Sequence, residues 1–133
     1  RQLATLYYDN GEKEKSVDTF ETAIRQESDK TIKANLYFNL GVLYMQLEKF
    51  EEAEDNFFSA YDLNPEDIEA LSGIAQTFET AEKWRRASKF YRELIELDPE
   101  NPDHYKGMSR VLIKQGDMDG ATRYFEKAKQ LGG

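Results

Sequence analysis

The feature that most constrains this chain is a pattern that returns every 34 residues. Leu63-Asn64-Pro65-Glu66 is echoed by Leu97-Asp98-Pro99-Glu100 at that step. Small and large apolar residues recur at the same period, in the columns Ala53, Ala87 and Ala121; Phe57, Tyr91 and Phe125; Tyr37, Leu71 and Tyr105; Leu40, Ile74 and Met108; and Tyr44, Phe78 and Leu112. Several independent columns at one period indicate stacked copies of one structural unit.

Within each unit the apolar residues are three and four positions apart, which is the spacing of one face of an α-helix. No stretch alternates at period two, so no β-sheet is expected. Pro65 and Pro99 fall between helices, where proline breaks no interior hydrogen bond. Gly11 and Gly116 are expected in the turns inside the first and last hairpins. The sequence predicts helices near residues 2–10, 13–27, 31–47, 50–63, 68–81, 84–97, 102–115 and 118–131.

The second unit carries the clearest motif. It reads Tyr37-x2-Leu40-Gly41-x2-Tyr44, then Ala53-x3-Phe57, then Ala60 and Pro65. This order of residues resembles the tetratricopeptide repeat, with tyrosine in place of the usual first tryptophan. The resemblance covers nearly the whole chain and implies an all-α, right-handed superhelical solenoid of antiparallel helix-turn-helix hairpins. The matching residues are packing residues, so they point to a fold more sharply than to a function.

We expect one domain of residues 1–133, with an incomplete first repeat at about 1–30 and further repeats at 34–67, 68–101 and 102–133. The first repeat departs from the pattern. Ser16 stands where the other units have alanine, and Lys13 stands where they have Phe50, Trp84 or Met118. We therefore expect a looser unit at this edge, and a fragment of a longer protein.

Composition and charge exclude several classes of function. A net charge of −8 opposes general binding to nucleic acid or to an anionic membrane surface, and there is no cysteine for a thiolate site. The one histidine, His104, is expected on an exposed helix face, without partners for a nucleophile or a metal site. No glycine-rich phosphate loop, calcium-loop spacing or membrane-length apolar run occurs. We predict no enzyme, no cofactor, no metal and no direct membrane contact.

The resemblance implies a binding surface as well, because the first helices of the hairpins line a concave peptide groove in this family. Residues that packing does not use, three and four apart, would form that face. In the second and third repeats they include Asn35, Phe38, Asn39, Val42 and Gln76. Phe38 and Val42 offer an apolar patch, while Asn39 and Gln76 are suited to hydrogen-bond a peptide backbone or are simply solvated.

In the fourth repeat the same face carries Lys106, Arg110 and Lys114, four residues apart. We name these three residues the basic stripe. It is suited to acidic side chains or a C-terminal carboxylate. The alternative is that these are solubilising charges, since an exposed ion pair contributes only about 0–1 kcal/mol.

Two further features qualify the groove. Gly73 and Gly107 occupy equivalent mid-helix places, where glycine costs about 1 kcal/mol relative to alanine. They indicate a need for space, for a ligand or for helix packing. The dicarboxylate clamp of the family is matched only at Arg1 and Asn39, so that subtype is not expected.

We predict a protein–protein interaction scaffold that binds a peptide or protein segment of unknown identity. A second class of function stays open. The last hairpin is followed only by Leu131-Gly132-Gly133, which leaves Tyr124, Phe125 and Ala128 without a covering helix. Solenoids need covered ends. The C-terminal hairpin would then pack on another copy, as a homo-oligomer or a spacer. The compartment of this soluble chain stays open, with a slight preference for the cytoplasm.

Overall fold

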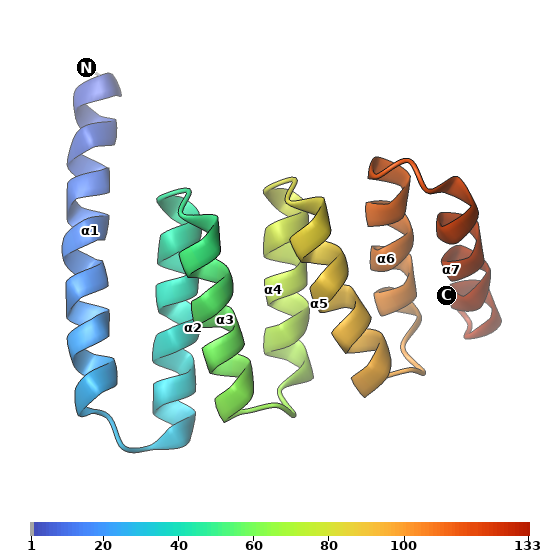
Figure 1. Ribbon diagram of the computed structural model, residues 1–133, viewed down its shortest axis with the longest axis horizontal. Coiled ribbons are helices and arrows are strands. Elements are labelled where there is room, and N and C mark those ends of the chain that lie inside the picture. The colour runs from blue at the N-terminus through green and yellow to red at the C-terminus, as the bar shows by residue number, and fades with distance from the viewer. Residues whose placement is uncertain (1) are drawn as a thin grey trace. The chain divides into compact units, whose positions relative to one another are not determined.

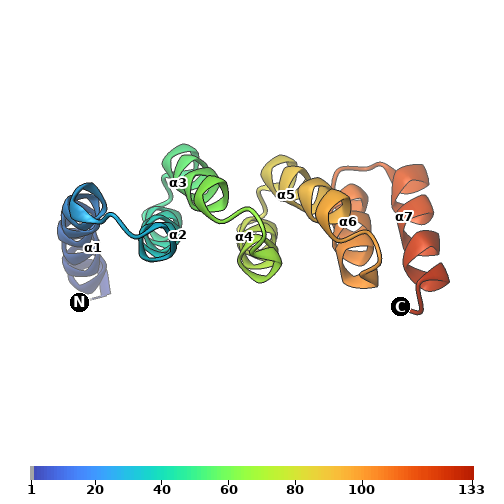
Figure 2. The ribbon, with the colours of Figure 1, turned by 90° about the horizontal axis from the view of Figure 1, so that it is seen from below.

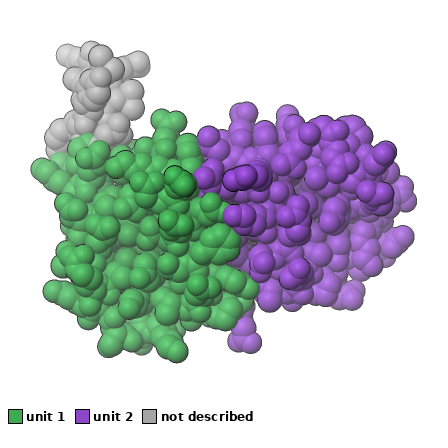
Figure 3. Space-filling model, viewed as in Figure 1, with its two compact units in different colours: residues 1–65 green, residues 66–133 purple. Residues whose placement is uncertain are grey.

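A computed structural model describes the backbone of residues 2–133 and the side chains of residues 11–133. The described residues form α-helices without strands, in the order α1 (Gln2–Gln26), α2 (Lys30–Gln46), α3 (Phe50–Leu63), α4 (Ile68–Thr80), α5 (Trp84–Leu97), α6 (Pro102–Lys114) and α7 (Met118–Gln130) (Figure 1). The chain divides into two compact units, Arg1–Pro65 and Glu66–Gly133 (Figure 3). The predicted all-α architecture of antiparallel hairpins is confirmed.

From α2 onward, each helix begins and ends within one residue of its predicted position. Local capping explains this accuracy. Side chains of Asp29, Asp67, Asn101 and Asp117 accept hydrogen bonds from backbone N–H groups in the first turns of α2, α4, α6 and α7. Such bonds satisfy donors that a helix start leaves unpaired.

One turn geometry closes all three hairpins. Glu48, Glu82 and Gly116 have φ values of 59°, 60° and 85°, in the left-handed region. The next residue in each case donates its N–H to a carbonyl five positions back, as Lys49 does to Tyr44 at 2.9 Å. This is the Schellman pattern of a helix C-terminus. The turn predicted at Gly116 is confirmed.

In the first unit, α2 and α3 form a hairpin with a very close contact. A Cβ atom on Gly41 would lie 2.5 Å from the ring of Phe57, so only glycine fits there without movement. Ala53 and Phe57 are fully buried in the same hairpin. Helix α1 packs on α2 through a cluster of apolar residues, which are Val17, Phe20, Ile24, Leu36, Tyr37, Leu40, Leu43 and Tyr44.

In the second unit, α4 pairs with α5 and α6 pairs with α7, while α6 also packs on α5. Figure 2 shows α6 between α5 and α7. The Ser109 hydroxyl donates to the Ala121 carbonyl at 2.8 Å, which satisfies a buried polar group between α6 and α7. The predicted apolar columns are buried here with the exception of Phe125, which is 49% exposed. The buried members are Leu71, Ile74, Phe78, Ala87, Tyr91, Tyr105, Met108, Leu112 and Ala121.

The first hairpin is where the prediction is wrong. Residues expected to form two helices with a turn at Gly11 form the single helix α1. After the corresponding turns the next helix begins with an apolar residue, Phe50, Trp84 or Met118, but here that place is taken by Lys13. Ser16 and Thr19 donate their hydroxyls to carbonyls four residues earlier, at 3.0 and 3.2 Å, as side chains within a continuous helix do. We infer that no turn forms here because Lys13 and Ser16 replace the apolar residue and the alanine of the later repeats.

We expect Gly11→Ala to stabilise the protein by about 0.5–1 kcal/mol, because alanine is the better residue in a helix interior. Nothing lies within 4 Å of a Cβ atom at this position, so no clash offsets the gain. The measurement is the free energy of unfolding in urea.

Gly116→Ala is the matched control, since a Cβ atom there also meets nothing within 4 Å but φ is +85°. It should destabilise the protein by about 1–2 kcal/mol. A loss of stability in Gly11→Ala would mean that Gly11 occupies a turn and that α1 is not continuous.

Candidate functional site

The structure places four of the candidate groove residues on α2, in the first unit. Asn35 and Asn39 are exposed, whereas Phe38 and Val42 are half-buried. The ring of Phe38 packs against Phe57, with ring centroids 5.6 Å apart. Phe38, one half of the expected apolar patch, therefore packs within its own unit. Asn35 and Asn39 are the candidates on α2 that remain accessible to a ligand.

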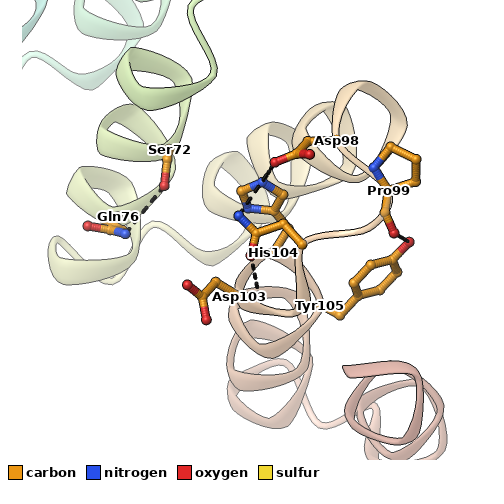
Figure 4. Close-up of polar contacts among 8 residues, drawn as sticks. Ser72, Gln76, Asp98, Pro99, Asp103, His104 and Tyr105 are labelled. Carbon is orange, nitrogen blue, oxygen red and sulfur yellow. Dashed lines mark hydrogen bonds and ion pairs between the residues drawn. The ribbon is translucent and has the colours of Figure 1, made fainter. Parts of the chain in front are cut away.

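The other four candidates lie in the second unit, on two first helices that contact each other. Gln76 on α4 is exposed, and its Nε2 donates to Ser72 Oγ at 3.4 Å (Figure 4). On α6, Arg110 and Lys114 are exposed and Lys106 is half-buried. We call the exposed side of α4 and α6 the first-helix face. That these residues share one groove with those of α2 stays a prediction.

Arg110 is tied to its own protein. Its Nε and Nη2 donate to the two carboxylate oxygens of Glu79 on α4, at 2.8 and 3.1 Å. The hydroxyl of Tyr91 on α5 donates to the same carboxylate at 2.6 Å. These three groups join three helices of the second unit. Arg110 is therefore a structural cation first, which sequence reasoning missed because Glu79 lies 31 residues earlier.

The electrostatics of this network follow from its geometry. Burial alone would raise the pKa of Glu79, but the hydrogen bonds from Arg110 and Tyr91 and the attraction of the guanidinium outweigh it and lower the pKa below 4.5. Burial and the adjacent carboxylate raise the pKa of the Tyr91 hydroxyl far above 10.0. At neutral pH the network holds one anion, one cation and one neutral phenol.

A slot opens beside this network. It has a volume of about 320 Å³ and is lined by Glu79, Thr80, Trp84, Arg110, Ile113 and Lys114. Lys114 Nζ lies 6.0 Å from the centroid of the Trp84 ring, within the range of a cation–π contact. Ile113 is 48% exposed. The slot thus combines apolar walls with positive charge on the first-helix face.

Gly107 lies in the helix packing. A Cβ atom on it would come within 2.3 Å of the Tyr91 ring, so α6 approaches α5 closely only because this residue is glycine. Of the two explanations offered for Gly107, space for a ligand or for packing, the structure supports packing.

His104 is also placed differently from the prediction. It is 3% exposed, whereas an exposed position was expected. Its Nε2 lies 3.0 Å from Asp98 Oδ2 (Figure 4). Asp98 ends α5, and His104 lies in the first turn of α6, so the loop of residues 98–101 folds the pair together. The imidazole of His104 is therefore buried, and its contact with Asp98 links the start of α6 to the end of α5.

The described part of the chain shows neither a cluster suited to a metal ion nor a helix suited to a membrane. Among its residues, no group of three or more histidine, aspartate or glutamate side chains is arranged to hold a metal ion. Within the same range, no helix is both long and apolar enough to cross a bilayer.

Comparison with known proteins gives a consistent family. Three tetratricopeptide repeat models match residues 2–30, 34–67 and 73–133, which together are nearly the whole chain. The crystal structure of MamA superposes with a TM-score of 0.67 at 21% identity, over 98% of this chain and 75% of that one. Identity at this level supports the fold alone.

The curated relatives are much longer proteins than this chain. Anaphase-promoting complex subunit 3 of Schizosaccharomyces pombe is 27% identical over 122 residues, which are 92% of this chain and 18% of that protein. Protein unc-45 homolog B of Xenopus laevis is 27% identical, over 84% of this chain and 12% of that protein. Protein O-mannosyl-transferase TMTC3 of Homo sapiens is 28% identical, over 96% and 14%. The chain spans less than a fifth of each of these relatives.

We expect Glu79→Gln to cost about 1–2 kcal/mol of stability at pH 7, because it removes a charged acceptor shared by Arg110 and Tyr91. A carboxyl whose pKa is lowered by folding contributes stability above its unfolded pKa and loses it as pH falls through the folded pKa. The difference from wild type should therefore shrink below the ordinary value of 4.5.

Urea unfolding at pH 7 and pH 3 measures this difference. Glu126→Gln is the control, since Glu126 is exposed on α7. A Glu79→Gln penalty that is as large at pH 3 as at pH 7 would show that the carboxylate charge does not carry the network.

Proposed function

Because the chain belongs to the tetratricopeptide repeat family, whose members are protein-interaction scaffolds, we propose that it binds a peptide or protein segment on its first-helix face. The observation that carries this proposal is the slot between α4, α5 and α6. Trp84 and Ile113 form its apolar part, and Lys114 and Arg110 give it positive charge. One relative is named as a subunit of the anaphase-promoting complex, which agrees with a role in protein association.

We infer that the ligand is acidic. Lys106 and Lys114 pair with no carboxylate among the described residues, while the carboxylate of Glu79 is saturated by Arg110 and Tyr91. An acidic segment would gain one charge-assisted partner at each of these two lysines, which lie about two turns apart on α6. Gln76 on α4 would supply a hydrogen bond to the backbone of such a segment, and Asn35 and Asn39 offer the same kind of group on the first unit.

We also infer that this part of the chain is not catalytic. His104 is buried against Asp98, so this histidine is not available on the described first-helix face as the base of a nucleophile–base pair. The relative named as a mannosyl-transferase is matched over 14% of its length, so its named activity does not carry over.

The double substitution Lys106→Glu with Lys114→Glu should weaken binding of acidic peptides at least tenfold, about 1.4 kcal/mol. The reason is that two attractive charges become repulsive ones. A peptide array in which every acidic member is paired with its glutamine counterpart measures the preference. Arg110 is left unchanged, because Arg110→Glu would place a second carboxylate beside Glu79 and destabilise the contact between α4 and α6.

Lys15→Glu with Arg85→Glu is the matched control. Both residues are exposed on other helices, and each double variant changes the net charge from −8 by four units, to −12. The proposal fails if Lys106→Glu with Lys114→Glu keeps the preference of the wild type, or if the control loses it equally.

Self-association through the C-terminal hairpin is the second candidate. Phe125 is 49% exposed and Met118 is 58% exposed, whereas Tyr91, in the same column as Phe125, is 2% exposed. We expect sedimentation to show a species of twice 15.5 kDa if this face pairs two copies. Phe125→Ser should then return it to a monomer, while Ile32→Ser, a similarly exposed apolar residue on α2, should not. A monomeric wild-type chain at high concentration would exclude this candidate.

A further inference from the structure

A second hollow in the second unit shares no residue with the slot. It has a volume of about 550 Å³ and is formed by α5, α6 and α7. In Figure 2, α6 lies between the other two helices. We call this hollow the second-helix trough, because α5 and α7 are the second helices of their hairpins. Its size falls within the range of about 300–1,000 Å³ that is usual for ligand sites.

Apolar side chains line the trough. Tyr105, Met108 and Leu112 of α6 are buried, and Tyr124 of α7 is half-buried. The rings of Tyr105 and Tyr124 lie 6.3 Å apart. The Tyr105 hydroxyl already donates to the Pro99 carbonyl at 2.9 Å (Figure 4). Most of the apolar surface that this lining offers to a ligand side chain therefore belongs to Tyr124, because the three residues of α6 are largely covered.

Three exposed cations complete the lining, Arg92 of α5 and Arg123 and Lys127 of α7. No ion pair with a described residue occupies any of them, in contrast to Arg110. The one carboxylate of the trough, Asp117, accepts the Gly120 N–H at 2.9 Å as the cap of α7. Three positive charges against one negative charge make the trough locally basic, in a chain whose net charge is −8.

We propose that the second-helix trough docks an acidic segment of a partner protein, in which one large apolar side chain is flanked by aspartate or glutamate. The apolar side chain fills the space over Tyr105 and Tyr124. The flanking carboxylates pair with Arg92 on one helix and with Arg123 and Lys127 on the other, as bidentate and single hydrogen bonds.

A peptide fits this lining better than a phosphate compound does. Phosphate sites at helix starts use free backbone N–H groups, but the Gly120 N–H at the start of α7 is already bonded to Asp117. The net charge of −8 also repels a polyphosphate more strongly than it repels single carboxylates. The trough is separate from the first-helix face, so this inference stands or falls independently of the proposed function.

The test uses a labelled, end-blocked peptide with one phenylalanine between two pairs of glutamates, followed by fluorescence anisotropy at low salt. Arg92→Ser with Arg123→Ser and Lys127→Ser should weaken its binding to the full chain at least tenfold. Replacing the glutamates by glutamine, or the phenylalanine by serine, should each weaken binding to the wild type by a similar factor. The substitutions of Arg92, Arg123 and Lys127 are at exposed sites, so circular dichroism should show that the variant keeps the helix content of the wild type.

The control variant is Lys15→Ser with Lys30→Ser and Arg85→Ser, which removes the same charge from exposed sites that line neither hollow and should bind the peptide as the wild type does. Lys106→Ser with Lys114→Ser is measured beside it. Loss of binding in that variant, with binding kept by the trough variant, would place the peptide on the first-helix face and overturn the trough. Four other results would also overturn it: unchanged binding by the trough variant, equal binding of the glutamine peptide, tighter binding of ATP at the same three cations, or no saturation below about 1 mM peptide.

Discussion

The close approach of helices at one aromatic column is the interaction on which the rest of the structure depends. Phe57 lies against Gly41 within its hairpin, and Tyr91 lies against Gly107 of the helix that follows. Residues of this column thus close one hairpin, at Phe57, and join another hairpin to the helix that follows it, at Tyr91. Packing at this distance requires a residue without a Cβ atom opposite each ring, and it leaves few voids. Small residues at these positions therefore set the spacing of the helices, and the spacing decides which side chains remain accessible.

Polar groups next to these close helix contacts form hydrogen bonds and ion pairs with one another. Tyr91 cannot bury its hydroxyl without a partner, and Glu79 accepts it at 2.6 Å. A half-buried carboxylate in turn needs a positive charge, which Arg110 supplies. Similarly, His104 becomes buried where α6 meets the end of α5, and Asp98 satisfies it. An exposed-looking charged residue on a first helix is therefore available to a ligand only if the neighbouring hairpin offers it no partner.

Sequence periodicity predicted the fold well where each hairpin repeats the same local signals. Capping residues, the left-handed turn residue and the apolar columns all lie within one repeat, so α2 to α7 were placed within one residue. It failed where the outcome depends on contacts between helices. Gly11 has the right residue type for a turn, yet Lys13 and Ser16 supply no apolar contact to close it. The partner of Arg110 lies 31 residues away, three short of the repeat, where a search of equivalent columns does not look.

The positions of the unpaired cations are the strongest indication of where a ligand would bind. A charge on a solvated helix surface contributes little to binding by itself. A cation beside an apolar hollow can pair with an anionic group of a ligand while the hollow takes up an apolar side chain of the same ligand. Lys114 meets this condition beside Trp84, and Arg92 and Arg123 meet it beside Tyr124. Arg110 does not meet this condition, because its guanidinium already forms an ion pair with Glu79. In the proposed binding modes, the unpaired cations beside the two hollows of the second unit would select an acidic partner by their position rather than by the overall charge of the chain.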